Sequence, residues 1–278
     1  MSEDTDARAN NLALWEGLAT LHGAGLPGYY DVDSLVAGRN PIHPEVETVL
    51  AVATEGSGVG GLDVIHVQSH VGVDSVELAR RGARVTCTDF SPTALQQARA
   101  LAQASGVELA TVEADSTALP ESLHERFDLA YVTIGAICWI ADLDGWMRSV
   151  AACLRPGGTL LLVEIHPLRE MVETFEPLVL DMSYGFTPGG LSFDEDGSYA
   201  DPTAKLPATK GTVFSHSIGE TVNAAIHAGL RIDHLREFTE SSFDASGELE
   251  PDDDGVVRWR INGGEPLPLY FGLVARKD

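Results

Sequence analysis

Cysteine, lysine and long apolar runs are all scarce in this chain of 278 residues. Its three cysteines, Cys87, Cys138 and Cys153, are odd in number, and their spacings fit neither a disulfide framework nor a zinc site. Cys87 and Cys153 fall within apolar stretches, where a thiol acts as a small hydrophobic group. No apolar run approaches the ~20 residues that a membrane-spanning helix needs. We therefore expect neither a disulfide-stabilised scaffold nor a bilayer-spanning segment.

Positive charge is also sparse. The chain has 18 Lys and Arg against 42 Asp and Glu, so its formal net charge is -24. An acidic surface repels phosphate backbones and anionic lipids, so we expect neither a nucleic-acid partner nor a membrane partner. The first ten residues are acidic and polar, without the basic and then apolar order of a signal peptide. The sequence therefore predicts a cytoplasmic protein.

What is present, from about residue 60 onward, is a regular alternation of strand-like and helix-like segments. Short apolar runs predict strands, and apolar residues at helical spacing predict the helices between them. Strands separated by helices of this length favour a parallel sheet that is covered on both faces. The predicted strands are 62–67, 84–88, 108–113, 127–133 and 159–165, and the predicted helices are 73–81, 92–104 and 143–154.

The remaining segments are expected to cover and complete this sheet. Residues 1–58, with helical patterns at 5–21 and 44–53, are interpreted as a helical lid on a main domain formed by residues 59–278. The alternation fails between about 166 and 216, which we interpret as an inserted cap. A capping box from Ser217 to Glu220 then opens a helix, and strands are predicted at 230–238 and 267–275.

The loop after the first strand is where a sheet of this kind usually binds its ligand, because the strand order reverses there. This loop reads His-Val-Gln-Ser-His-Val-Gly, so only Gly72 stands where a close backbone approach demands glycine. Asp89 ends the second strand, about 20 residues later, where a carboxylate can accept hydrogen bonds from ribose hydroxyls. The alternative, that Asp89 only caps the next helix, is weaker because Ser91 already occupies the N-cap position.

Two further residues have positions that suit an adenine base. Asp115 follows the third strand and is placed to accept a hydrogen bond from an adenine amino group, an interpretation that we favour over the alternative of a solvated loop acid. Phe90 could lie against the face of adenine or belong to the core.

Five segments together resemble the class I S-adenosylmethionine-dependent methyltransferases of the small-molecule, type 11/25-like kind. They occur in the order and at the spacing of that family over about residues 60 to 166. The Arg-Pro-Gly-Gly turn from Arg155 to Gly158 is the most telling of them. The segments are 66–72, 84–92, 113–115, 127–131 and 154–160.

The resemblance implies a doubly wound, Rossmann-like α/β sheet of seven strands, mostly parallel with an antiparallel last strand. It also implies S-adenosyl-L-methionine as the methyl donor, S-adenosyl-L-homocysteine as the product, and a small molecule as the methyl acceptor. The residues implied to bind the donor are Gln68, Ser69, His70 and Gly72 along the methionine part, Asp89 at the ribose with Ser91 beside it, Phe90, Asp115 and Ser116 at the adenine, Thr133 and Ile134 at the methionine end, and Tyr30 in a loop that folds over the site.

The glycine loop departs from the commonest pattern of this family. An acid usually stands at the position of His66, and glycines stand at those of Gln68 and His70. The chain resembles a branch of the family in which this loop reads His-x-Gln-x-His-x-Gly. The family pattern therefore does not identify the side chain that would hold the methionine amino group.

Methyl transfer requires a positioned acceptor and only sometimes a base. The candidate bases are His166, at the end of the fifth strand, and His216, before the capping box, because histidine exchanges protons near neutral pH. The alternative for each is a structural hydrogen bond to backbone. Candidates for the pocket wall, or else for simple packing, are Tyr29, Tyr30, Trp139 and Tyr184. His66 and His70 lack further ligands, so no metal is expected.

Other functions remain compatible with parts of the pattern. The same fold could bind S-adenosylmethionine and catalyse a non-methylating reaction, or it could be a non-catalytic, degenerate cofactor domain. The presence of both Asp89 and Asp115 argues against a degenerate domain. A dinucleotide-dependent oxidoreductase is disfavoured because the glycine fingerprint is missing.

Overall fold

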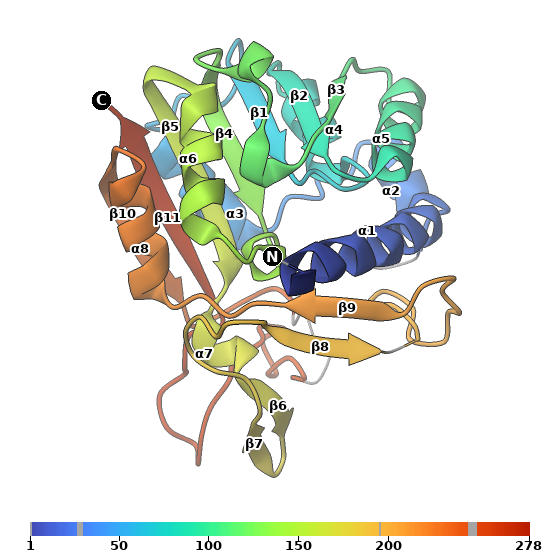
Figure 1. The fold of residues 1–278 in the computed structure, drawn as a ribbon, viewed down its shortest axis with the longest axis vertical. Helices are drawn as coiled ribbons and strands as arrows, with labels where there is room; N and C mark the ends of the chain where they lie inside the picture. Colours follow the sequence, from blue (N-terminus) through green and yellow to red (C-terminus); the bar gives the residue numbers. More distant parts are fainter. Residues whose placement is uncertain (1, 27–29, 195, 244–248) are drawn as a thin grey trace.

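A seven-stranded sheet is the centre of the computed structural model, which describes residues 2–26, 30–194, 196–243 and 249–278. In this sheet β11 pairs antiparallel with both β10 and β5, and the other described strands pair in parallel, which confirms the predicted fold class. The order reverses between β1 and β4, where the carboxyl ends of the strands open a crevice. From edge to edge (Figure 1) the strands are β10 (Leu230–Phe238), β11 (Tyr270–Lys277), β5 (Leu154–Ile165), β4 (Phe127–Thr133), β1 (Asp63–Val67), β2 (Arg84–Asp89) and β3 (Ala110–Glu113).

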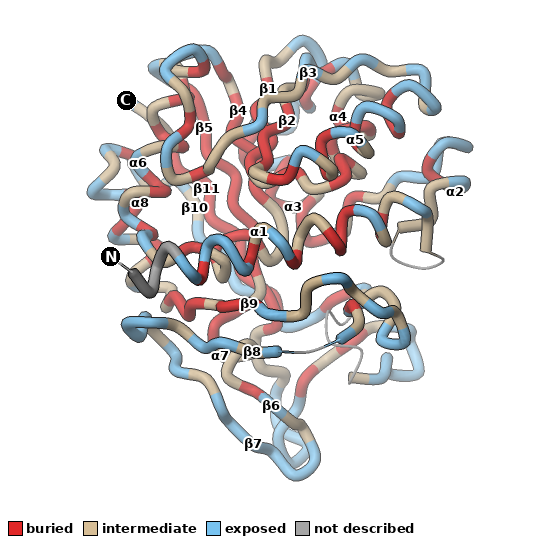
Figure 2. Tube along the Cα trace, turned by 45° about the vertical axis from the view of Figure 1, so that its right-hand side comes forward, coloured by how far each residue is buried: buried red, intermediate tan, exposed pale blue. Residues whose placement is uncertain are grey.

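Helices cover both faces of this sheet. One face packs against α3 (Pro44–Ala53), α4 (Val73–Arg80) and α5 (Pro92–Ala104), and the other packs against α6 (Leu143–Cys153) and α8 (Ile218–His227). The buried residues, red in Figure 2, follow β1, β4, β5 and β11 through the middle of the molecule. Successive residues of a strand point to opposite faces, so each central strand contributes to both cores.

The predicted bounds of several elements can be compared with the structure. β4 and β10 have the predicted bounds, and Ser217 caps α8 in the predicted capping box with Glu220. β5, in contrast, begins at Leu154 and includes the predicted Arg-Pro-Gly-Gly turn. A Cβ on Gly158 would lie 2.9 Å from the carbonyl oxygens of Arg155 and Phe127, so only glycine fits where this strand starts.

A second layer of structure lies beyond the carboxyl ends of the strands (Figure 1). The helix α1 (Ser2–Gly23) crosses there, and Asn11 makes two hydrogen bonds, of 2.9 and 2.8 Å, with the backbone of Thr212 in β9. The short helix α2 (Val32–Val36) follows it in the chain. The described residues 166–194 and 196–216 also belong to this layer, with α7 (Pro167–Glu170), β6 (Val172–Phe175), β7 (Leu178–Leu180), β8 (Leu191–Asp194) and β9 (Lys210–Val213).

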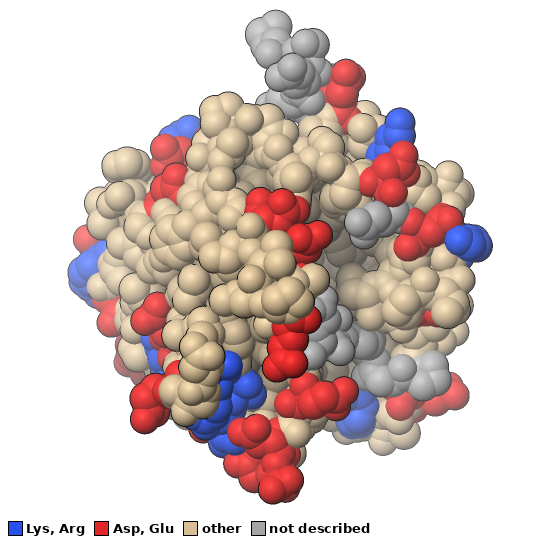
Figure 3. Space-filling model, turned by 90° about the horizontal axis from the view of Figure 1, so that it is seen from below, with Lys and Arg blue, Asp and Glu red and all other residues tan. Residues whose placement is uncertain are grey.

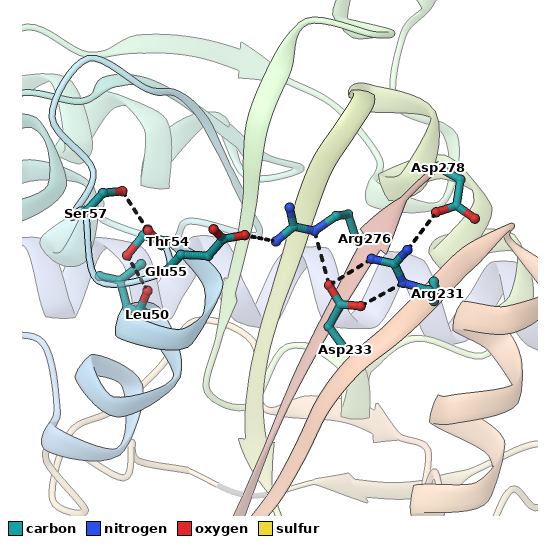
Figure 4. Close-up of polar contacts among 8 residues, drawn as sticks. All are labelled: Leu50, Thr54, Glu55, Ser57, Arg231, Asp233, Arg276 and Asp278. Carbon is teal, nitrogen blue, oxygen red and sulfur yellow. Dashed lines mark hydrogen bonds and ion pairs between the residues drawn. The ribbon is translucent and has the colours of Figure 1, made fainter.

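The opposite end of the sheet carries an ion-pair network (Figure 4). Arg276 of β11 contacts Glu55, beyond the end of α3, at 2.7 Å and Asp233 of β10 at 3.1 Å. Arg231 contacts Asp233 at 2.9 Å and Asp278 at 3.4 Å. The network therefore joins the last two strands to the connection between α3 and β1.

Candidate functional site

A pocket of about 660 Å³ opens at the carboxyl ends of β1, β2 and β4. The loop from Gln68 to Asp74 forms its floor, and the segments after β2 and β4 form one side. Residues from α1, from the segment before α3, and from the cap complete the wall. The aromatic side chains that line it are Trp15, Tyr30, Phe90, Trp139, Tyr199 and Phe243.

The backbone of the glycine loop keeps the conformation that glycines would favour. Gln68 has φ 56 and His70 has φ 50, both in the left-handed region, and Gly72 has φ 76. A Cβ on Gly72 would lie 2.8 Å from Cβ of Ala98 in α5, so this glycine is required for packing as well. Gln68 and His70 therefore accept the strained backbone of the missing glycines.

The side chain of Gln68 offsets that strain by joining three elements. Its Nε2 donates to the carbonyl of Ala136, after β4, at 2.9 Å, and its Oε1 accepts from Nε1 of Trp146 in α6 at 2.9 Å. A glycine could make neither hydrogen bond. Gln68, at a position where the family commonly has glycine, thus fixes the floor of the pocket relative to β4 and α6.

The side chain of His70 is the centre of a second set of contacts. Its Nε2 hydrogen-bonds Nδ1 of His22 in α1 at 2.7 Å, and Nε2 of His22 hydrogen-bonds Oγ of Ser198 in the cap at 2.7 Å. Tyr30 stacks on His22 with 4.2 Å between ring centroids, and its hydroxyl hydrogen-bonds that of Tyr199. Burial lowers the pKa of His22 to about 4, so this chain of contacts is neutral at pH 7.

Asp89 lines the pocket where its ribose role was predicted. Its carboxylate accepts from the backbone N–H groups of His70 and Ser91, each at 2.9 Å. Burial raises the pKa of Asp89 to about 6 despite these hydrogen bonds. Ser91 caps α5 by accepting from the N–H of Ala94, and its hydroxyl donates to Glu16 of α1. The helix α1 is thereby attached to the start of α5.

The residues predicted to hold the cofactor divide into two groups, according to whether they line the pocket. The pocket lining includes the first group, which is Tyr30, Gln68, Ser69, His70, Gly72, Asp89, Phe90, Thr133 and Ile134. The lining does not include the second group, which is Ser91, Asp115 and Ser116. Oδ2 of Asp115 accepts from Nε of Arg8 in α1 at 2.7 Å. Arg8 is 55% exposed, so this ion pair is open to solvent.

Two buried or half-buried carboxylates, Glu164 near the end of β5 and Asp74 in the first turn of α4, were not predicted from the sequence. Glu164 of β5 accepts hydrogen bonds from three successive N–H groups, of Gly135 at 2.5 Å, Ala136 at 2.7 Å and Ile137 at 3.0 Å, and burial raises its pKa. Asp74 of α4 lines the pocket and accepts from the hydroxyls of Tyr131 at 2.8 Å and Thr133 at 3.1 Å. Glu164 therefore shapes the loop after β4, and Asp74 brings negative charge to its base.

The far wall of the pocket was also missed. It includes Arg39, His43 and Phe243, and the ring of His43 stacks on that of Phe243 with 3.9 Å between centroids. Arg39 is the single Lys or Arg of the lining, and its side chain has no ion-pair partner within the described residues. Acidic side chains spread over the face seen in Figure 3, in a chain with 42 Asp and Glu against 18 Lys and Arg. A cation in the pocket therefore runs against the general charge of the molecule.

The two predicted bases lie outside the pocket lining. Nε2 of His166 hydrogen-bonds Glu237 at 2.8 Å, and its Nδ1 accepts from the N–H of Leu168 at 3.1 Å. Nε2 of His216 hydrogen-bonds the carbonyl of Ile140 at 2.7 Å. Both histidines thus make the structural contacts that were their alternatives, and their role as bases stays a prediction.

The predicted aromatic wall is partly assembled. Trp139 and Tyr30 line the pocket, whereas Tyr184 is 42% exposed in the cap and does not. Tyr29 lies outside the described residues. No group of three His, Cys, Asp or Glu side chains in the described ranges could hold a metal ion. None of the helices described here has the length and apolar character needed to cross a membrane.

Comparison with known proteins agrees with this geometry. A model of the methyltransferase domain matches residues 64–158. A ubiquinone biosynthesis O-methyltransferase of Methylobacterium sp. (strain 4-46) is 29% identical over 188 residues, which are 66% of this chain and 67% of that relative.

Solved structures show the same fold. An S-adenosylmethionine-dependent methyltransferase from Mesorhizobium loti has a TM-score of 0.57 at 21% identity, covering 87% of this chain and 100% of that chain. The cyclase SpnF has a TM-score of 0.54 at 16% identity, covering 84% of this chain and 80% of that chain. At these identities the likeness concerns the fold alone.

Proposed function

Because residues 64–158 match the model of a methyltransferase domain, we propose that the chain is a class I S-adenosylmethionine-dependent methyltransferase that transfers a methyl group to a small-molecule acceptor bound in the 660 Å³ pocket. The observation that carries the proposal is Asp89, a buried carboxylate at the end of β2 that faces the pocket. A cleft of this size and apolar character suits a small molecule.

The donor set of the pocket fits S-adenosylmethionine. Of the lining residues, Asp89 would accept hydrogen bonds from the ribose hydroxyls and Phe90 would border the adenine. Ser116, outside the lining, would border the adenine as well. Asp115 would accept from the adenine amino group in place of Arg8, since an exposed ion pair of this kind contributes only ~0–1 kcal/mol.

Two lining residues of opposite charge suit the methionine end of the cofactor. Asp74 offers a carboxylate beside Thr133, which suits an ammonium group, and Arg39 offers a guanidinium, which suits a carboxylate. The amino-acid part of S-adenosylmethionine carries both groups. We assign to Asp74 the contact with the methionine amino group that the family's acid makes elsewhere in the loop, because His66 is occupied by a 2.7 Å hydrogen bond to Ser75.

S-adenosylmethionine supplies an electrophilic methyl group on a sulfonium. The chain's own contribution is to orient the acceptor against that group and to exclude water. Residues 1–58 act as the lid and residues 166–216 as the cap, and the contacts of His22 with His70 and Ser198 hold both of them over the glycine loop.

Calorimetric titration with S-adenosylhomocysteine tests the proposal. We expect micromolar binding to the wild type, weakened more than tenfold by Asp89→Ala, which is about 1.4 kcal/mol. Asp253→Ala removes an exposed aspartate outside the pocket and is the matched control, with unchanged affinity. No binding to the wild type at either low or high salt would contradict the proposed function.

A further inference from the structure

One histidine of the pocket differs from the other two because its ring nitrogens have no hydrogen-bond partner in the part of the chain that the structure describes. His43 precedes α3 and lines the pocket, yet neither ring nitrogen has a hydrogen-bond partner within the described residues. In His70 and His66, by contrast, a ring nitrogen is bonded, to His22 and to Ser75 at 2.7 Å each. The imidazole of His43 is therefore held in place by stacking on Phe243 and keeps its nitrogens available to a ligand.

Three charged groups surround His43 from the elements packed around it. Asp74 approaches from α4, Glu45 lies in the first turn of α3, and Arg39 lies four residues earlier in the chain. Glu45 is 5% exposed, and its Oε2 has no partner in the described part of the chain, while its Oε1 accepts from the N–H of Ser242 at 3.1 Å.

Burial favours the neutral form of His43, whereas the carboxylates of Asp74 and Glu45 favour the protonated form. Burial lowers the pKa of His43, so the ring is neutral and able to accept a proton at pH 7. Asp74 and Glu45 stabilise the imidazolium that forms when it does so. A neutral imidazole with anionic groups nearby is the arrangement expected of a general base.

The wall around His43 indicates the shape of its partner. Phe243 presents a ring face, and Val46, Ile134 and Ile165 add aliphatic surface. A flat, apolar framework fits this wall better than a highly hydrated one. A hydroxyl on such a framework is a phenol, whose pKa of about 10 lies within reach of an imidazole, unlike that of an aliphatic alcohol.

Resting on the proposed function, we propose that His43 is the base that accepts the proton of a phenolic hydroxyl on the methyl acceptor. In the step, the bond from the acceptor oxygen to the methyl carbon forms while the bond from that carbon to sulfur breaks, leaving S-adenosylhomocysteine. The hydroxyl proton passes to a ring nitrogen of His43 and from there to water. The acceptor class is therefore a hydroxylated aromatic compound.

An equilibrium measurement tests the contact without turnover. Protein saturated with S-adenosylhomocysteine is titrated at pH 6 with 4-nitrophenol and with nitrobenzene, which differ by the hydroxyl alone. We expect the wild type to bind 4-nitrophenol about fivefold more tightly, the effect of one hydrogen bond. His43→Phe keeps the stacked ring and should bind both probes equally. His234→Phe, on the outer strand β10, is the control and should behave as the wild type.

A kinetic measurement distinguishes a base from a structural residue. With phenol at pH 7, His43→Phe should lower kcat about 100-fold with little change in KM. With 4-nitrophenol at pH 9, where the probe is already ionised in solution, the deficit should shrink to less than threefold. His43→Gln repeats both comparisons with a smaller side chain, and retained affinity for S-adenosylhomocysteine shows that each variant is folded.

Three results would overturn the proposal. They are equal affinity of the wild type for 4-nitrophenol and nitrobenzene, an equal deficit of the His43 variants on both substrates, and absence of transfer to phenol by a wild type that binds S-adenosylhomocysteine. Each leaves the proposed function intact, which fails instead if S-adenosylhomocysteine does not bind.

Discussion

The two ends of the sheet treat charge in opposite ways. At the carboxyl end, His22 and His66 are buried and neutral, each with a pKa lowered to about 4 by desolvation. At the amino end, Arg276 and Arg231 remain charged in water-exposed pairs with carboxylates (Figure 4). Electrostatic interactions at the carboxyl end are strong because the surroundings there have a low dielectric constant. Those at the amino end are weakened by water and dissolved ions.

This difference indicates where the molecule's behaviour will depend on conditions. Titration of a buried group changes stability or binding in proportion to its pKa shift, whereas an exposed ion pair contributes little. We therefore expect pH to act on the carboxyl end and salt to act weakly on the amino end.

The largest expected effect is acid destabilisation through His22 and His66. Their folded-state pKa values of about 4 lie below the ordinary 6.5, so the unfolded chain binds protons first. The contribution is fully present above pH 6.5 and is lost as pH falls towards 4, by on the order of 3 kcal/mol for each group. Urea unfolding at pH 7 and pH 4.5 measures the loss, and His22→Gln should reduce it.

The control for this prediction is His234→Gln, because His234 lies on the outer strand. It should leave the pH dependence of the unfolding free energy as in the wild type. Asp89 acts in the reverse direction, since its pKa is raised to about 6 and its protonation stabilises the fold as pH falls from 6 to 4. A wild type equally stable at pH 7 and 4.5, with His22→Gln unchanged from it, would break the comparison.

A smaller effect is expected on cofactor affinity. Ribose hydroxyls need an ionised acceptor, and Asp89, with a pKa raised to about 6, is mostly protonated at pH 5 and mostly ionised at pH 7. The affinity for S-adenosylhomocysteine should rise up to about tenfold over this range. Calorimetry measures this affinity at pH 5 and pH 7 for the wild type and for Asp89→Asn. If the affinity of the variant depends on pH as that of the wild type does, Asp89 is not the cause.

The smallest effect is expected at the other end of the sheet. Arg276→Gln breaks the contacts with Glu55 and Asp233, yet it should change the free energy of unfolding by less than about 1 kcal/mol. The change should shrink further near 1 M salt, because screening weakens exposed pairs. Thermal unfolding at low and high salt measures it, and a loss of several kcal/mol would erase the contrast between the two ends.

The sheet and the position of the carboxylate at the end of β2 could be predicted because their signals are local. The strand from Phe127 to Thr133 is marked by its own apolar residues. Asp89 follows the glycine loop by about 20 residues, which is the usual separation in the sequence. The capping box at Ser217 likewise lies within one helical turn.

The remaining site residues could not be predicted because their partners are distant in the chain. Asp74 looks like an ordinary acid in the first turn of a helix, and only folding brings Tyr131 to it. Glu164 stands in an apolar strand, and the N–H groups that it accepts from lie after β4. His43 has no local motif at all, and its contact with Phe243 joins segments separated by most of the sequence.

The position of β11 in the sheet has a consequence for synthesis on the ribosome. β5 pairs with β4 on one side and with β11 on the other, yet roughly a hundred residues separate Ile165 from its partner Tyr270. At ~5–20 residues per second, the inner edge of β5 stays open for roughly 5–20 seconds after it emerges. Leu160, Leu161 and Leu162, wholly buried in the finished protein, are then exposed to other nascent chains. Pairing with β11 thus closes this edge of β5 only after the other strands of the sheet have been synthesised.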